Sequence, residues 1–255
     1  MNILITAGGT SERIDDVRTI GNTATGRLGR LVAECFLEDA GNRVTYLCPR
    51  GADRPDSPRA RILPVGDVQS LRDAVEREMR AVPYDAVVHS MAVSDYTVNR
   101  AVSCEELTKR LAAAVRGAVP ERKDLEERIR SALLEGGGPQ PGKISSDIDH
   151  LFLCLEKTPK IIGLFKKLRP ETVLVGFKLL SGVEEPVLLR AAESLMERNG
   201  CDFVLANDLR GIGETRHEAI LLGSDRSVRR LGTRQQIARA IEESVTRKVG
   251  EGKKK

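Results

Sequence analysis

A short polar segment at residues 22–27 (NTATGR) has the residue types of an anion-binding site. It leads directly into a stretch with helical apolar periodicity, so we expect it at the start of a helix. Free backbone amides and the positive end of the helix dipole attract phosphate or carboxylate groups there. Arg18 and Arg27 flank the segment with positive charge. Ordinary N-capping by Thr23 or Thr25 is the alternative explanation.

A second candidate is Lys143, which lies in residues 142–146 (GKISS) after the glycine-rich stretch 136–139. A lysine between flexible glycines and small hydroxyl residues could turn onto a phosphate as a compact positive charge. A solvated surface charge is the simpler interpretation of a lone lysine.

Gly8 and Gly9 follow the first apolar run and suggest a nucleotide-binding loop. A G-x-G-x-x-G turn would open the next helix at once, whereas about a dozen polar residues come first here. Tyr96 and Arg100 have the spacing of the Tyr-x-x-x-Lys pair of short-chain reductases. Arginine does not replace a lysine that acts as a compact charge at close range. An NADP-dependent, Rossmann-type reductase is therefore an alternative with weak support.

Composition excludes several classes of function. The chain has no Trp and only 3% aromatic residues, which argues against stacking platforms for single-stranded nucleic acid. The net charge of +4 is small, and the basic residues are interspersed with acids, which favours small anionic ligands over duplex DNA. The five cysteines lack C-x-x-C spacing and the three histidines lack an H-E-x-x-H pattern, so we expect no zinc site. No signal peptide or membrane-length apolar run is visible, so we expect a cytoplasmic protein without a membrane partner.

The elements that must position these residues alternate along the chain. Short apolar runs predict strands at residues 3–5, 44–47, 86–90, 151–155, 173–177, 203–206 and 219–222. Amphipathic patterns between them predict helices at residues 28–36, 67–79, 161–168, 186–198 and 233–245. This alternation indicates an α/β fold with a doubly wound, mostly parallel, Rossmann-like sheet. Such sheets bind ligands at the carboxyl ends of their strands, where loops 6–25, 90–99 and 177–181 would gather.

Residues 105–134 interrupt the alternation with two charged helical patterns on either side of Pro120. We interpret them, with the hinge at 136–139, as a helical or flap excursion that serves as a lid or an oligomer contact. The expected organisation is a single nucleotide-binding domain over residues 1–250 with an insert at 101–142. Residues 251–255 are expected to form a disordered basic tail.

Several motifs, taken in order, resemble phosphopantothenoylcysteine synthetases. They are ITAGGT (5–10), IDDVR (14–18), NTATGRLG (22–29), MAVSDY (91–96), KISS (143–146), KTPKI (157–161), VGFKL (175–179) and ANDL (206–209). The resemblance extends from residue 2 to about residue 245. The KISS and GFKL segments are similar to the standalone synthetases rather than to the form fused behind a flavin-dependent decarboxylase. The resemblance therefore implies no flavin.

The resemblance implies a two-step ligation in coenzyme A biosynthesis. The carboxylate of 4′-phosphopantothenate attacks the α-phosphate of CTP or ATP, and this gives an acyl-nucleotidylate (acyl-CMP with CTP) and pyrophosphate. The amine of cysteine then attacks the acyl carbon and releases the nucleoside monophosphate. Mg²⁺ with the nucleotide and a homodimer are expected, and the other partners would be small-molecule substrates, with no nucleic acid.

The resemblance also assigns residues. Asn22 and Lys143 would be catalytic, the first contacting the carboxylate and the acyl intermediate, the second binding the phosphates. The substrate-binding residues would be Arg18, Asn22, Thr25, Gly26 and Arg27, with Arg18 supporting either the loop or the substrate. The nucleotide-binding residues would be Gly8, Gly9, Met91, Asp95, Lys143, Pro159, Lys160, Ile161, Ile162, Phe177 and Arg198. Asp95 could instead coordinate Mg²⁺, and no resident metal is expected.

Two departures from the family pattern bear on the nucleotide. Arg27 stands where many members have lysine, which keeps the charge. Leu195 and Asn199 occupy roughly the places of two lysines of the fused bacterial enzymes, with Arg198 adjacent. The choice between CTP and ATP therefore stays open. A non-catalytic nucleotide-sensing module is the other alternative.

Overall fold

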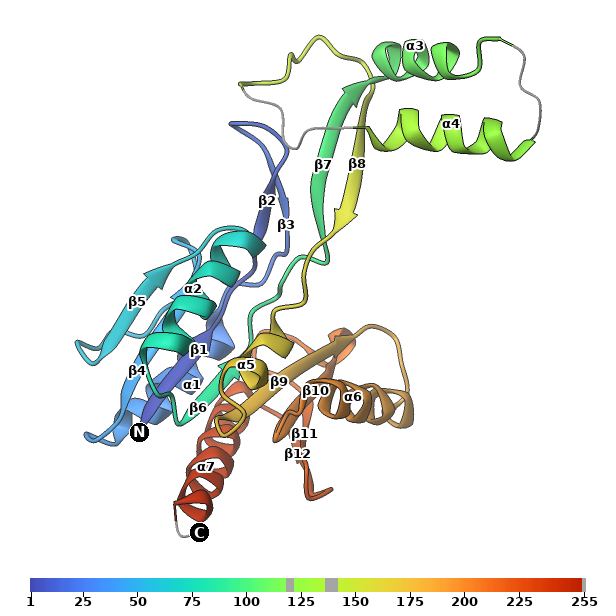
Figure 1. Ribbon diagram of the computed structural model, residues 1–255. Helices are drawn as coiled ribbons and strands as arrows, with labels where there is room; N and C mark the ends of the chain where they lie inside the picture. The colour runs from blue at the N-terminus through green and yellow to red at the C-terminus, as the bar shows by residue number, and fades with distance from the viewer. Residues whose placement is uncertain (118–121, 136–141, 254–255) are drawn as a thin grey trace. The chain divides into compact units, whose positions relative to one another are not determined.

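The computed structural model describes residues 1–117, 122–135 and 142–253 (Figure 1). Pro120 and the predicted hinge at 136–139 lie outside these residues. The chain divides into two compact units. Unit 1 comprises residues 1–10, 22–93 and 160–255, and unit 2 comprises residues 11–21 and 94–159.

Unit 1 is built on an eight-stranded sheet with the order β12-β11-β10-β9-β6-β1-β4-β5 (Figure 1). Six neighbouring strands are parallel: β1 (Asn2–Thr6), β4 (Arg43–Cys48), β5 (Ala60–Pro64), β6 (Ala86–His89), β9 (Val173–Leu180) and β10 (Phe203–Asp208). β11 (Ala219–Gly223) and β12 (Val228–Leu231) complete one edge in antiparallel pairing. The prediction of a doubly wound, mostly parallel sheet is confirmed.

Helices cover both faces of this sheet. α1 (Arg27–Glu38) and α7 (Arg234–Gly252) pack on one face, and α2 (Val68–Ala81), α5 (Ile162–Leu168) and α6 (Glu185–Asn199) pack on the other. Each face of the sheet forms a hydrophobic core with its helices, and successive strand residues alternate between the two cores. Ile3 and Ile5 belong to the core under α1 and α7, and Leu4 belongs to the core under α2, α5 and α6. Burial of both faces explains why these strands read as continuous apolar runs in the sequence.

Unit 2 contains a short hairpin, a long antiparallel ribbon and two helices. The hairpin pairs β2 (Ser11–Arg13) with β3 (Thr19–Gly21), and the ribbon pairs β7 (Tyr96–Ser103) with β8 (Leu151–Lys157). The two predicted charged helices are present as α3 (Cys104–Ala114) and α4 (Arg122–Leu134). Neither helix has a fully buried residue, in keeping with their charged sequences.

Two expectations about this region are corrected. The strand predicted at 151–155 is β8, but it pairs with β7 and not with the large sheet. None of its side chains is fully buried, whereas strands inside the large sheet are covered on both faces. The insert expected at 101–142 falls inside unit 2, which is wider and also takes in the β2–β3 hairpin. The residues expected to form one domain with an insert thus contain two compact units, and β2 packs against β7 in unit 2.

The prediction of a disordered tail from residue 251 is wrong for residues 251–253. α7 continues to Gly252, and the Lys253 ammonium lies 2.9 Å from the Asp85 carboxylate. This ion pair joins the end of the helix to the loop that precedes β6. Residues 254 and 255 lie outside the described part of the chain.

Candidate functional site

The loops that follow β1 and β6 are joined at the carboxyl edge of the unit 1 sheet. Gly9 forms a parallel bridge with Ala92. The Ala92 amide donates to the Gly8 carbonyl at 2.9 Å, and the Thr10 amide donates to the Ala92 carbonyl at 3.1 Å. The backbone of both loops is therefore fixed where ligands of parallel α/β sheets bind.

Asn22 is held against this junction. Its backbone amide donates to the Thr10 carbonyl at 3.2 Å, and its side-chain amide donates to the Ala92 carbonyl at 3.0 Å. The approach requires glycine at position 9, since a Cβ there would lie 2.5 Å from the Asn22 carbonyl oxygen. The side chain is exposed, and within the described residues its oxygen has no hydrogen-bond partner. Asn22 can therefore offer one amide hydrogen and one carbonyl oxygen to a ligand.

The N-terminus of α1, which begins at Arg27, follows Asn22 after four residues and has no side-chain cap. Gly26 precedes the helix with φ +87°, a left-handed conformation that favours glycine, and no side chain caps the helix. The Thr25 hydroxyl only accepts a long bond of 3.3 Å from the Arg27 amide. No acidic residue lies in the first turn. N-capping by Thr23 or Thr25 is therefore not what the structure shows, and the uncapped amides with the exposed Arg27 retain an anion-binding geometry.

Residues 160–162 of the predicted turn at 159–162 lie at the start of α5, next to the end of α6. A Cβ built on Gly163 would lie 3.4 Å from the Asn199 Oδ1, so α6 closes on the first turn of α5. The contact of α5 with α6 lies within unit 1, and Arg198, which precedes Asn199 in the sequence, is exposed. These residues form a second group, built from a different loop than Asn22.

Three of the predicted nucleotide contacts belong to the cores. Met91 and Ile161 are only 6% and 1% exposed and pack in the α2/α5/α6 core. Only their backbone groups are available to a ligand. Phe177, on β9, is half-buried and packs against the opposite core, so one part of its ring stays accessible.

Unit 2 bonds Arg18 to the segment that carries Lys143. The Arg18 guanidinium bonds the Asp15 carboxylate through Nε at 2.9 Å and Nη2 at 2.6 Å. Nη2 also donates to the Ile144 carbonyl at 2.6 Å. Arg18 therefore supports the loop, which is one of the two roles that the sequence left open. Lys143 is exposed, and its ammonium has no partner among the described residues.

Asp15 is the residue that sequence reasoning missed. Its carboxylate is fully buried and accepts hydrogen bonds from the Val17, Arg18 and Ile144 amides as well as from the Arg18 side chain. Burial by itself raises the pKa of this carboxyl, but these donors outweigh it and hold the pKa well below its ordinary value. The available signal was an acid three residues before an arginine.

The predicted residues Asp95 and Pro159 lie on neighbouring segments of unit 2. The Thr158 amide donates to the Asp95 carbonyl at 3.1 Å, and its hydroxyl donates to the Ser94 carbonyl at 2.6 Å. Both Asp95 and Pro159 are exposed. The structure thus pairs the two segments through Thr158.

The reductase pattern at Tyr96 and Arg100 does not form a catalytic pair. Arg100 is only 6% exposed, and its Nη2 donates to the Ala132 and Leu133 carbonyls at 3.0 and 2.6 Å. Tyr96 is 49% exposed at the start of β7. Arg100 therefore caps the C-terminus of α4 through Nη2, while its buried Nε and Nη1 have no hydrogen-bond partner among the described residues.

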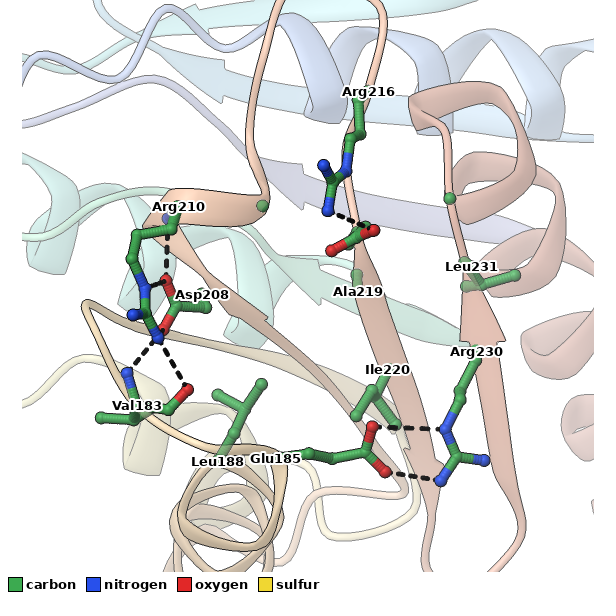
Figure 2. Close-up of a pocket in the computed structure, with 13 residues that line it drawn as sticks. Val183, Glu185, Leu188, Asp208, Arg210, Arg216, Ala219, Ile220, Arg230 and Leu231 are labelled. Carbon is green, nitrogen blue, oxygen red and sulfur yellow. Dashed lines mark hydrogen bonds and ion pairs between the residues drawn. The ribbon is translucent and has the colours of Figure 1, made fainter.

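A cavity of about 610 Å³ lies elsewhere in unit 1, beside the end of β10 (Figure 2). Its charged lining consists of three pairs: Arg210 with Asp208, Arg216 with Glu218, and Arg230 with Glu185. None of the predicted site residues lines it. Since each guanidinium already faces a carboxylate, the cavity offers an anion no unpaired cation.

The described residues contain neither a three-ligand metal cluster nor a membrane-spanning helix. No group of three His, Cys, Asp or Glu side chains is placed to hold a metal ion there. Nor does that part of the chain contain a helix with the length and apolarity needed to cross a membrane.

A family model described as the DNA/pantothenate metabolism flavoprotein C-terminal domain matches residues 1–121 and 138–248. The chain belongs to this family. Among its relatives, the coenzyme A biosynthesis bifunctional protein CoaBC of Thermococcus kodakarensis is 33% identical over 223 residues, which are 88% of this chain and 45% of that protein. CoaBC of Methanocaldococcus jannaschii is 25% identical over 250 residues, 97% of this chain and 51% of that protein. The chain thus spans about half the length of these relatives.

Solved structures of the family share the fold. The DNA/pantothenate metabolism flavoprotein from Streptococcus pneumoniae matches with a TM-score of 0.80 and 33% identity, over 97% of this chain and 99% of that chain. A Cab2 mutant in complex with phosphopantothenate-cysteine matches with a TM-score of 0.68, over 99% of this chain and 88% of that chain. At 18% identity the second match supports the fold alone. The resemblance inferred from the sequence motifs is confirmed.

Proposed function

We propose that this chain is a ligase of coenzyme A biosynthesis that couples 4′-phosphopantothenate to cysteine with a nucleoside triphosphate. The observation that carries the proposal is the uncapped N-terminus of α1, four residues after the exposed Asn22 amide. A substrate with both a phosphate and a carboxylate suits a helix N-terminus next to a neutral hydrogen-bonding group. The CoaBC relatives are named as proteins of coenzyme A biosynthesis, which supports a role in the same pathway.

The first step is attack of the substrate carboxylate on the α-phosphate. A new O–P bond forms, the bond to the β-phosphate oxygen breaks, and pyrophosphate leaves. We assign Asn22 to hold the carboxylate, because a neutral amide orients one oxygen without a competing ion that would weaken its attack. The α1 amides with Thr25, Gly26 and Arg27 are assigned to an anionic group of the substrates.

In the second step the cysteine amine attacks the acyl carbon, the acyl–phosphate bond breaks, and the nucleoside monophosphate leaves with its electron pair. The amine loses a proton as the amide forms. We assign Lys143 to the phosphates in both steps, since its ammonium can neutralise charge that develops on the leaving groups. The mixed anhydride requires exclusion of water until cysteine arrives.

We assign the triphosphate and base to the remaining predicted contacts: Gly8, Gly9, Asp95, Pro159, Lys160, Ile162, Phe177 and Arg198, with backbone groups of Met91 and Ile161. Mg²⁺ in such sites is held largely by the phosphates and one or two carboxylates. A Mg²⁺ ion that arrives with the nucleotide fits a chain whose described residues form no three-ligand metal cluster. Bound there, it would withdraw charge from the phosphates.

We further propose that the protein acts as a homodimer. Eight of the twelve exposed large hydrophobic side chains among the described residues lie in unit 2, although unit 2 is the smaller unit. They include Tyr96, Phe152 and Leu155 on the β7–β8 ribbon. Concentration of exposed apolar side chains on one part of a protein is typical of an association surface.

The test is a panel of CTP, ATP, GTP and UTP with Mg²⁺ and 4′-phosphopantothenate, assayed for pyrophosphate release before and after cysteine is added. We expect release that depends on phosphopantothenate and on CTP or ATP, and amide product only with cysteine. Absence of release with every nucleotide would reject the ligase. Nucleotide binding without turnover would favour the sensing module, and tight NADP binding in a fluorescence titration would favour the reductase.

A further inference from the structure

The segment that carries Lys143 is fastened to the β2–β3 hairpin on both sides of the lysine. On one side, the Gly142 amide donates to the Asp16 carboxylate at 2.8 Å, and the Asp16 amide donates to the Gly142 carbonyl at 3.1 Å. On the other side, the Ile144 amide donates to the Asp15 carboxylate at 3.1 Å, and the Ile144 carbonyl accepts from Arg18 at 2.6 Å. All four backbone polar groups that flank Lys143 are thus bonded within residues 15–18.

Asp15 is the centre of this arrangement. One carboxylate oxygen accepts from the Val17 and Arg18 amides at 2.8 and 2.7 Å, and this closes the hairpin turn. The other oxygen accepts from the Arg18 guanidinium and from the Ile144 amide. Its side chain is fully buried, and Ile144 is only 6% exposed. A buried carboxylate with five donors is a rigid junction, because loss of any donor leaves charge uncompensated.

We propose that Asp15 is a positioning residue for Lys143. It fixes the backbone on which the lysine stands and at the same time occupies Arg18, so that Lys143 is the cation left available next to the hairpin. This inference rests on the proposed ligase function for its kinetic consequence. We call the hydrogen bonds between residues 15–18 and the backbone of Gly142 and Ile144 the clamp. The clamp depends only on contacts within unit 2.

Substitution of Asp15 by Asn tests the clamp with almost no change in volume. The new amide can present one oxygen to the Val17 and Arg18 amides, but its NH₂ group then faces the Ile144 amide and the Arg18 guanidinium, donor against donor. We expect faster hydrogen exchange of the Gly142 and Ile144 amides and a fall in pyrophosphate-release kcat of roughly 10- to 100-fold, the scale of a small misplacement of a reacting group.

Whether the effect of Asp15→Asn on kcat depends on Lys143 distinguishes a positioning role of Asp15 from a purely structural one. In a double-mutant cycle, Asp15→Asn should lower kcat in the wild-type background and add no further loss to Lys143→Gln. The matched control is Asp147→Asn, an exposed carboxylate in the same segment that is bonded to the Ser145 hydroxyl. We expect the control to retain wild-type kcat and amide exchange.

Several outcomes would overturn the proposal. If the losses of kcat caused by Asp15→Asn and by Lys143→Gln multiply in the double variant, Asp15 acts independently of the lysine. Unchanged exchange at Ile144, or faster exchange with wild-type kcat, would contradict the clamp and its consequence respectively. Arg18→Gln removes the bond to the Ile144 carbonyl but keeps the turn, so it gives the same test if Asp15→Asn does not fold. If the wild-type protein releases no pyrophosphate, the ligase fails, and amide exchange alone decides whether the clamp holds the segment.

Discussion

Acidification should destabilise unit 1 through His89, which ends β6 in the interior of the sheet. The imidazole is 7% exposed, its Nδ1 lies 2.7 Å from the Thr6 hydroxyl, and its ring centroid lies 5.2 Å from that of Phe165. Burial without a carboxylate partner lowers its pKa from 6.5 to about 4. Between these two pKa values, His89 is therefore protonated in the unfolded chain but neutral in the folded state.

The sign and size of the effect follow from these two pKa values. Above about pH 6.5, His89 is neutral in both the folded and the unfolded state, and its contribution to the free energy of unfolding is complete. As the pH falls toward about 4, only the unfolded state gains the proton, and this contribution to stability is lost. A difference of about 2.5 pKa units corresponds to about 3 kcal/mol in full, and about 2 kcal/mol of this is lost by about pH 5. His217, whose pKa is also lowered to about 4 by burial and by Arg234, adds to the decline in the same interval.

Urea unfolding at about pH 7.5 and about pH 5 measures this contribution. The chain has no Trp, and two of its three tyrosines, Tyr46 and Tyr84, are buried in unit 1, so near-ultraviolet circular dichroism reports that unit. The free energy of unfolding of His89→Gln should fall between the two pH values by about 2 kcal/mol less than that of the wild type. His150→Gln, which removes an exposed imidazole from a loop of unit 2, is the control. An equal decline in the wild type and in His89→Gln would refute the reasoning.

Two further predictions concern activity and assembly. Lys143→Gln should lower the rate of pyrophosphate release by roughly 10²-fold, because one cationic contact to the developing phosphate charge is lost, and should change the free energy of unfolding by less than about 0.5 kcal/mol, since the side chain is exposed. A loss of Tm that matches the loss of activity would contradict this assignment. Sedimentation equilibrium should give a mass of about twice 27.9 kDa, and a fully active monomer would reject the proposed dimer.

The sheet of unit 1 could be predicted because its signals are local. Strands buried on both faces appear as short apolar runs, and β1, β4 and β6 were found in this way. The edge strands β5 and β12 were missed, since their residues are half-buried or exposed and carry arginines. Edge strands often carry charge, which removes the apolar pattern that identifies a strand.

The hairpin of unit 2 could not be predicted for a related reason. The sequence pattern predicts one loop over residues 6–25, yet this segment contains β2 and β3. What fixes them is the contact of Asp15 with Ile144, 129 residues away. The same difficulty applies to β8, whose apolar sequence suits either a sheet interior or an exposed ribbon. Local periodicity carries no information on which partner a segment will meet.

The roles of the motif residues can be separated by asking which of their polar atoms are already bonded. Arg18 has an apparent ligand-binding position in the sequence, but its Nε and Nη2 serve Asp15 and Ile144. Asn22 uses one amide hydrogen for Ala92 and retains its oxygen, while Lys143 retains its whole ammonium among the described residues. A bonded group can take a ligand only by giving up a protein partner, at a cost of about 1–3 kcal/mol when the abandoned partner is buried. Asp15 is such a partner for Arg18, and this difference supports the proposal that Asn22 and Lys143 act on the substrates while Arg18 serves the scaffold.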